Sequence, residues 1–364
     1  MSGSTADPAT IAPESPGGFD RSDLDRLPAS HGVIAFDDAD GRAMRFLATA
    51  DARSCAGTRL IPSEEAPDRS AELAGITARV RFWPCSCALE ADLLHARLGP
   101  SVLAGGWDAI RRTLGFHALH ADPVEAHPRF RPRESADLPD GTLIGPFTTR
   151  KRADRFAEGL VDLYELCRKY ERLVEAPHAP SCVYKELGTC PAACDGSETM
   201  DAYRARFARA LELAREPADR SIERAAGRMS SAADALDFER AERERSALAR
   251  IESLRAPPNH LACDLRSAPW LAVSTARRKR RIYAAIIRGG RVLAERTLTH
   301  DVTAAAAQAF ARALDAPPEG SIDADVIGVL LARFARPKKK DPARLFVLAD
   351  GGAEEIGGKI ASFV

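Results

Sequence analysis

Four of the eight cysteines of this 364-residue chain gather in one segment, at Cys167, Cys182, Cys190 and Cys194. The first residues show neither the basic nor the apolar stretch of a secretory signal, so we expect a reducing, cytoplasmic setting in which disulfides are rare. Clustered thiolates there favour a metal centre, because soft sulfur ligands suit zinc and iron–sulfur clusters. Structural zinc sites usually use two short Cys pairs, and only Cys190 and Cys194 lie close in the sequence. The alternative is four buried thiols that pack as small apolar side chains.

The composition predicts several domains with aliphatic cores. Lysine plus arginine and aspartate plus glutamate both number 52, which excludes a globally basic nucleic-acid coat and an acidic tail. Aromatic residues make up only 6% of the chain, so Ala, Leu, Val and Ile are expected to fill the cores. No stretch approaches the roughly 18–20 apolar residues of a membrane span, and no membrane partner is expected.

The N-terminal third predicts a small α/β domain after a disordered start. Residues 1–27 are rich in Ser, Pro, Gly and Asp and are expected to be disordered. Residues 31–47 alternate around a turn at 38–41, which is typical of a β-hairpin. A strand is expected at 76–83, and apolar residues recur at helical spacing over 88–98.

Helices dominate the middle of the chain. After a strand near 143–147, a charged amphipathic helix is predicted over 149–170, and prolines and glycines then keep the cysteine segment irregular. Residues 201–254 read as helical with a break at 234–237, which predicts an antiparallel pair of helices followed by a linker at 255–259.

The last part of the chain predicts a separate small α/β domain of unknown role. A Gly-Gly turn at 288–291 joins two of its strands. The expected strands and helices lie at 270–273, 282–287, 292–297 and 345–348, and at 302–314 and 324–334.

The segment from Cys182 to Gly196, CVYKELGTCPAACDG, resembles the cysteine segment of the UvrC family of excision-repair endonucleases and of its shorter Cho-like relatives. The resemblance extends over about residues 28–254. It implies that Cys167, Cys182, Cys190 and Cys194 hold a [4Fe–4S] cluster, for which zinc is the alternative.

Residues 229–245 are similar to the UVR motif, a helix pair through which UvrC docks on UvrB. The resemblance implies partner contacts by Leu236, Phe238, Arg240, Ala241 and Arg245. An amphipathic hairpin that packs only within its own protein is the alternative. Two glutamates depart from the motif, at Glu242 and Glu244, where apolar residues are usual.

The hairpin near residue 34 resembles the start of a GIY-YIG nuclease domain, but most catalytic positions differ. Such a domain uses tyrosines, a lysine, an arginine and a metal-binding glutamate to cleave a phosphodiester. The replaced positions are Ile34, Arg45, Leu47, Ala48 and His95.

Arg53 is the one residue that the resemblance carries over to a catalytic role. His95 stands in place of the glutamate that would bind Mg²⁺, and imidazole is a poor ligand for a hard cation. We therefore expect a degenerate nuclease domain that keeps its fold and lacks activity.

A basic cluster in the C-terminal part predicts contact with DNA, because grouped cations neutralise phosphates. Its members are Arg277, Arg278, Lys279, Arg280 and Arg281, with Lys338–Lys340 as a second cluster. Trp270 and Tyr283 are the nearby aromatic residues that could stack on a base. A solvated loop is the alternative. Neither an RNase H-like nuclease nor helix-hairpin-helix motifs are evident in this part.

These patterns predict an α+β, multidomain protein. The expected parts are a disordered start, a degenerate GIY-YIG domain, a connecting β segment, a helical iron–sulfur segment, a UVR hairpin and a C-terminal α/β domain, at 1–27, 28–105, 106–150, 151–200, 201–256 and 257–364.

The expected function is that of a UvrC-like nucleotide-excision-repair protein that binds DNA and a UvrB-like partner and has an inactive nuclease domain. One alternative is an active Cho-like endonuclease with an altered, Mg²⁺-dependent site. A second alternative is a zinc-stabilised regulatory protein that uses only the UVR hairpin.

Overall fold

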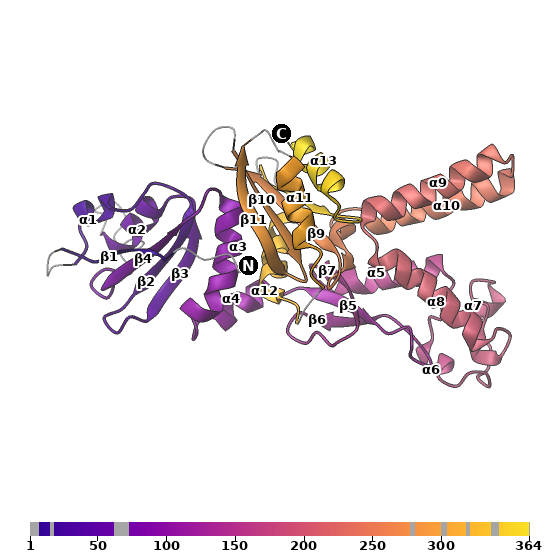
Figure 1. Ribbon diagram of the computed structural model, residues 1–364. Helices are drawn as coiled ribbons and strands as arrows, with labels where there is room; N and C mark the ends of the chain where they lie inside the picture. The colour runs from indigo at the N-terminus through magenta and orange to yellow at the C-terminus, as the bar shows by residue number, and fades with distance from the viewer. Residues whose placement is uncertain are drawn as a thin grey trace.

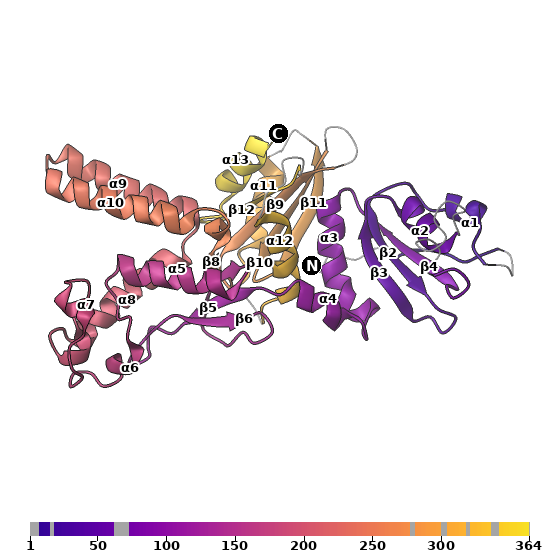
Figure 2. The ribbon, with the colours of Figure 1, turned by 180° about the vertical axis from the view of Figure 1, so that it is seen from behind.

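The computed structural model describes residues 7–14, 18–61, 73–276, 281–299, 304–317, 321–335 and 342–363. Within these ranges the chain forms three four-stranded sheets with helices on their faces. One sheet lies at one end of an elongated molecule, a helical hairpin projects at the other end, and the C-terminal sheet lies between them (Figures 1 and 2). No helix of the described part is long and apolar enough to cross a membrane.

The first sheet is antiparallel in the order β1-β4-β2-β3 and has helices on both faces. Every residue of β2 is buried, because alternate side chains enter two different cores. Ile34 and Phe36 face α2, whereas Val33 and Ala35 face α3 and α4. The elements are β1 (Ala9–Ile11), α1 (Arg21–Asp25), β2 (Gly32–Asp37), β3 (Ala43–Thr49), α2 (Ala52–Leu60), β4 (Arg79–Pro84), α3 (Ala88–Val102) and α4 (Trp107–Thr113).

The start of the chain is ordered where the structure describes it, in contrast to the disorder expected for residues 1–27. β1 pairs with β4, and α1 begins with a capping box between Asp20 and Asp23. Buried Ile11 and Leu24 anchor both elements to the first sheet. A few apolar residues are therefore enough to hold β1 and α1 in place, because the first sheet supplies the rest of the core.

The second sheet forms the middle of the molecule in the order β6-β5-β7-β8. Its last strand comes from the far side of the helical hairpin, so residues 259–265 return to this sheet before the chain enters the third one. The predicted strand near residue 143 and helix after residue 149 are present, but the helix ends at Leu163 and Glu165 follows with φ of 51°. The elements are β5 (His117–Ala121), β6 (Arg131–Glu134), β7 (Thr142–Phe147), α5 (Arg150–Leu163), η2 (Asn259–Leu261) and β8 (Cys263–Asp264).

Short helices form the cysteine segment, and longer ones follow it. The predicted antiparallel pair is α9 and α10, which stand side by side and project from the body (Figures 1 and 2). The elements are α6 (Tyr170–Leu173), α7 (Val183–Glu186), η1 (Ala193–Asp195), α8 (Met200–Arg215), α9 (Ala218–Asp234) and α10 (Phe238–Arg255).

Arg255 fixes the root of this hairpin. Its guanidinium is 2% exposed, lies over the ring of Phe156, and donates hydrogen bonds to the carbonyls of Ala262 and Leu213. Burial lowers the pKa of Arg255 to about 10. One side chain therefore joins α10 to α5, to α8 and to the strand that completes the second sheet.

The third sheet is antiparallel in the order β11-β10-β9-β12. The predicted Gly-Gly turn joins β10 and β11, and only glycine fits at Gly290, where φ is 77° and a Cβ would lie 2.1 Å from the carbonyl oxygen of Asp323. α11 and α13 cover one face and α12 covers the other. The elements are β9 (Pro269–Thr275), β10 (Arg281–Arg288), β11 (Arg291–Thr299), α11 (Ala304–Ala313), α12 (Ala324–Phe334), β12 (Arg344–Val347) and α13 (Ala353–Phe363).

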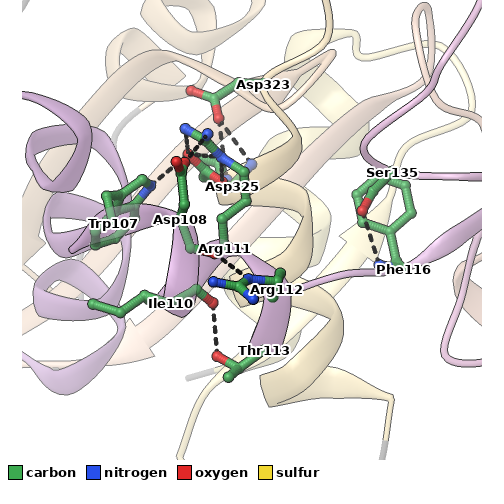
Figure 3. A network of polar contacts seen from close by, with 11 residues as sticks. Trp107, Asp108, Ile110, Arg111, Arg112, Thr113, Phe116, Ser135, Asp323 and Asp325 are labelled. Carbon is green, nitrogen blue, oxygen red and sulfur yellow. Dashed lines mark hydrogen bonds and ion pairs between the residues drawn. The ribbon is translucent and has the colours of Figure 1, made fainter. Parts of the chain in front are cut away.

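A buried polar joint connects α12 to α4 of the first domain (Figure 3). The Asp325 carboxylate accepts a hydrogen bond of 2.8 Å from the indole N–H of Trp107 and bonds from the guanidinium of Arg111, the shortest of 3.0 Å. Asp325 is 6% exposed. The apolar core around this joint draws residues from α3, from the second sheet and from the third sheet. One apolar core therefore joins α3 of the first domain to the second and third sheets.

We predict that Asp325→Ala lowers the free energy of unfolding by about 2–3 kcal/mol, because it leaves the buried indole N–H of Trp107 without an acceptor. The matched control is Asp108→Ala. Asp108 is the other carboxylate partner of Arg111, and its own side chain is 79% exposed. The control is expected to change stability by less than about 0.5 kcal/mol. Denaturant titration followed by circular dichroism measures both. Equal losses in the two variants would contradict the structural role of the joint.

Candidate functional site

The four clustered cysteines lie in the irregular segment between α5 and α8. The Cys167 thiol donates to the carbonyl of Lys169 at 3.3 Å. Its interaction with the thiol of Cys190 lowers the pKa of Cys190 to about 6 and raises that of Cys167. Burial raises the pKa of Cys194, with smaller contributions from the charges of Asp195 and of the neighbouring cysteines. Cys167 therefore lies close to Cys190, and Cys182 and Cys190 lie close enough to Cys194 to influence its pKa.

Polar contacts hold this segment in shape. Lys185 donates to Asp195 at 2.7 Å across the loop, which lowers the pKa of that carboxyl. Arg172 donates to the carbonyls of Pro180 and Ser181. Ala192 has φ of 63°, a left-handed conformation that turns the chain between Cys190 and Cys194. Short-range bonds therefore replace regular secondary structure here.

The donor set fits an iron–sulfur cluster in its chemistry. Four thiols of one segment are soft ligands, and two of them are buried and two half-buried. In the part of the chain that the structure describes, no group of three or more His, Cys, Asp or Glu side chains is arranged to hold a single metal ion.

The tip of the α9–α10 hairpin exposes two large apolar side chains. Leu236 is 72% exposed and has φ of 58°, and Phe238 is 71% exposed. The Asp237 side chain caps α10 by accepting from the backbone N–H of Arg240. An apolar tip at the end of a projecting arm is typical of a docking element.

Charged side chains of the α9–α10 hairpin form ion pairs beside the predicted partner-binding residues. Arg245 makes a bidentate pair with Glu242, and Arg228 of α9 donates to Glu244 at 2.9 Å. The two glutamates that depart from the UVR pattern are thus used within the hairpin. Ala241 is half-buried between the helices.

Arg53, the one predicted catalytic residue, makes structural contacts. Its guanidinium donates to the carbonyls of Leu27 and Asp25, each at 3.0 Å, and pairs with the Asp25 carboxylate. These bonds fasten α1 to α2. The arginine is therefore engaged at the opposite face of the sheet from α3.

His95, which stands at the position of the metal-binding glutamate, is packed inside the first domain. Its ring stacks on Phe46 with centroids 4.9 Å apart and meets Trp107 edge-on, and its Nε2 lies 3.0 Å from the carbonyl oxygen of Phe46. Burial lowers the pKa of His95. Asp92, one turn earlier on α3, pairs with Arg333 of α12. The side chains of His95 and Asp92 thus serve packing and the contact with the helix that covers the third sheet.

The predicted DNA-contacting residues lie mostly outside the described residues. Arg277, Arg278, Lys279 and Arg280, and Lys338–Lys340, belong to this group, whereas Arg281 begins β10 and is exposed. The suggestion that Trp270 and Tyr283 stack on bases is wrong. Both are buried, and they donate to the Cys263 thiol and to Glu295.

An arginine-lined groove of about 900 Å³ was not predicted from the sequence. We call it the α5 groove; it lies between α5 and the root of α10, with Arg152, Arg155, Arg168 and Arg250 on its walls. A signal for it was present in the sequence, because the first turn of α5 carries basic residues and no acidic one. Arg250 could not be placed beside that turn without the tertiary structure.

Comparison with known proteins places the likeness in the middle of the chain. Residues 116–213 match the family model of the UvrC/Cho excinuclease middle domain. This range runs from β5 into α8 and contains all four clustered cysteines. No solved structure matches the chain.

Two curated relatives, both UvrABC system protein C, are similar over part of their length. The protein of Haloquadratum walsbyi is 32% identical over 114 residues, which are 31% of this chain and 19% of that protein. The protein of Hyphomonas neptunium is 24% identical over 188 residues, 52% of this chain and 30% of the relative. The chain thus spans less than a third of the length of these relatives. The match of residues 116–213 and these similarities show that the chain is UvrC-like in its middle part.

Proposed function

We propose that this protein takes part in nucleotide-excision repair of DNA as a UvrC-like component with a structural iron–sulfur cluster and an inactive nuclease-like domain. The observation that carries the proposal is the match of residues 116–213 to the UvrC/Cho middle domain, which includes every clustered cysteine. The interaction between Cys167 and Cys190 supports a shared role for these thiols.

The cluster would be held by Cys167, Cys182, Cys190 and Cys194. Bound there, it supplies a rigid crosslink between distant parts of one irregular segment and a centre that can exchange one electron. The chain itself positions the four sulfurs: the left-handed turn at Ala192 and the bond between Lys185 and Asp195 set the path of the backbone.

We predict that anaerobically purified protein is brown and carries about four irons and four acid-labile sulfides per chain. Cys190→Ser and Cys194→Ser each remove one ligand and are expected to lose the colour and most of the iron. Cys55→Ser, which changes a cysteine of α2 far along the chain from the segment, is the matched control and should keep both. Metal analysis and visible absorption make the measurement.

Colourless parent protein with bound zinc would favour the zinc-stabilised regulatory protein instead. Full iron content in both serine variants would contradict the assignment of the ligands.

The hairpin is the proposed contact with a UvrB-like protein. Two features support this contact. The side chains of Leu236 and Phe238 are exposed at the tip, and the charged side chains of Arg240 and Arg245 lie close to it in the sequence. An exposed aromatic anchor that fills a partner pocket commonly contributes about 2 kcal/mol or more to binding.

We predict that Phe238→Ala weakens binding to a UvrB-like protein by about thirtyfold or more, because it removes the apolar anchor. Arg243→Ala changes an exposed residue of the same helix outside the predicted contact set and is the control. Isothermal titration calorimetry measures both affinities. Phe238 is exposed, so the variant is expected to fold; unchanged affinity in Phe238→Ala would overturn the docking role of the tip.

Lack of nuclease activity is proposed from the side chains that surround the former catalytic positions. Arg53 and His95 are engaged in structural contacts, and Asp92 is paired with Arg333. Each missing electrostatic group commonly costs a factor of about 10²–10³ in rate. The loss of several groups leaves little catalysis.

We predict no incision when the purified protein is incubated with Mg²⁺ or Mn²⁺ and a damaged duplex, with or without a UvrB-like protein. Denaturing electrophoresis of the labelled duplex makes the measurement. Incision that disappears in Arg53→Ala or His95→Ala would instead support the active Cho-like endonuclease. Incision that is unchanged in both variants would not depend on Arg53 or His95. Repeating the assay after a further purification step would then show whether a contaminating nuclease causes it.

A further inference from the structure

We propose that the α5 groove binds the phosphate backbone of DNA. This inference rests on the proposed function in DNA repair and assigns to it a site built from other residues than the basic clusters at 277–281 and 338–340 of the sequence. The groove is walled by α5, by the loop that precedes Cys190, and by the chain that follows α10.

Three of the four guanidiniums in the groove have no acidic partner among the described residues. No carboxylate of that part of the chain lies within ion-pair distance of Arg152, Arg155 or Arg250, although many other arginines are paired. Arg155 and Arg250 are exposed and Arg152 is half-buried. Three like charges that share one hollow repel one another, and an anion between them would relieve the repulsion.

The position of these charges on α5 is also unfavourable in the free protein. Arg150, Lys151 and Arg152 occupy the first turn of a 14-residue helix, where the helix dipole favours negative charge. Arg150 has a carboxylate within reach, that of Asp154 at 3.9 Å. A phosphate at this end of the helix would interact favourably with the dipole and with the side chains at once.

Two carboxylates also line the groove, and both lie toward the C-terminal end of α5. Asp162 is neutralised by Arg168, whose guanidinium lies 2.5 Å from it. Glu165 follows the end of α5. The cationic character is therefore concentrated near the first turns of α5 and near Arg250, which places the phosphate contacts there.

The shape favours a polymer over a small anion. A second hollow of about 460 Å³ shares Arg152 and Arg155 with the groove and continues past Lys151 to the end of α12. From Lys151 to Arg155, the cationic part of α5 rises by about 6 Å, which corresponds to the axial length of about two base pairs. One strand of a duplex can therefore place neighbouring phosphates along the two connected hollows, whereas a single phosphate would occupy only part of them.

The walls of the groove connect the other two proposed sites. Gly188 and Thr189 lie directly before Cys190, and Arg168 donates to the Thr189 carbonyl. Pro257 and Pro258 follow the last residues of α10. DNA in the groove would thus contact both the cysteine segment and the base of the partner-docking hairpin.

The test compares two triple variants of the full chain. Arg152→Ala, Arg155→Ala and Arg250→Ala together remove the unpaired groove cations. The control, Arg112→Ala, Arg209→Ala and Arg312→Ala, removes the same charge from exposed arginines that lack an acidic partner among the described residues and do not line the groove. Fluorescence anisotropy with a labelled duplex over a series of salt concentrations measures affinity. Circular dichroism and binding to the UvrB-like protein check that both variants fold.

The groove variant is expected to bind at least about tenfold more weakly than the parent, with the slope of log affinity against log salt reduced by about 2 to 3. The control should stay close to the parent. Equal binding by the groove variant and the parent, or equal losses in both variants, would overturn the groove site and leave the proposed repair function standing. A parent protein that does not bind the duplex would overturn both.

Discussion

The buried guanidinium of Arg255 sets the geometry on which the proposed sites depend. It has no carboxylate partner among the described residues, so its burial is tolerated only because two backbone carbonyls and the ring of Phe156 take the place of water. Those partners belong to α8, to the returning chain and to α5. Arg255 therefore links the root of the α9–α10 hairpin to α5, to α8 and to the chain that returns to the middle sheet.

The first domain is joined to the rest of the molecule along α3. This helix contributes Asp92 and Arg97 to ion pairs with the third sheet and its helix. His95 is held between Phe46 and Trp107. Trp107 in turn donates to Asp325 of α12. A helix that anchors another domain on one side and fills a core on the other has no free face for a substrate, which accords with a scaffold role.

Local patterns predicted the elements whose cause is local. The Gly-Gly turn between β10 and β11, the hairpin of β2 and β3, and the capped start of α10 at Asp237 follow from two to four neighbouring residues, and the structure confirms them. The pairing of β8 with β7 and the bond from Trp107 to Asp325 join residues more than one hundred positions apart, which no periodicity records. The prediction that Trp270 and Tyr283 stack on bases failed for the same reason. Their burial depends on helices that pack over the third sheet and are distant in the sequence. The clustering of the cysteines in the sequence indicated a metal centre, whereas the iron–sulfur ligand set came from a family resemblance and remains a prediction.

The length of the projecting hairpin gives it mechanical leverage. α10 has 18 residues and so extends about 27 Å from Arg255 to the tip. A tilt of about 10° at the base would sweep Leu236 and Phe238 through about 5 Å, close to the width of a side-chain pocket. Pro257, Pro258 and Arg250 flank the base of the hairpin and also line the α5 groove. DNA bound in the groove could therefore change the tilt of the hairpin and so the position of its tip relative to a bound protein.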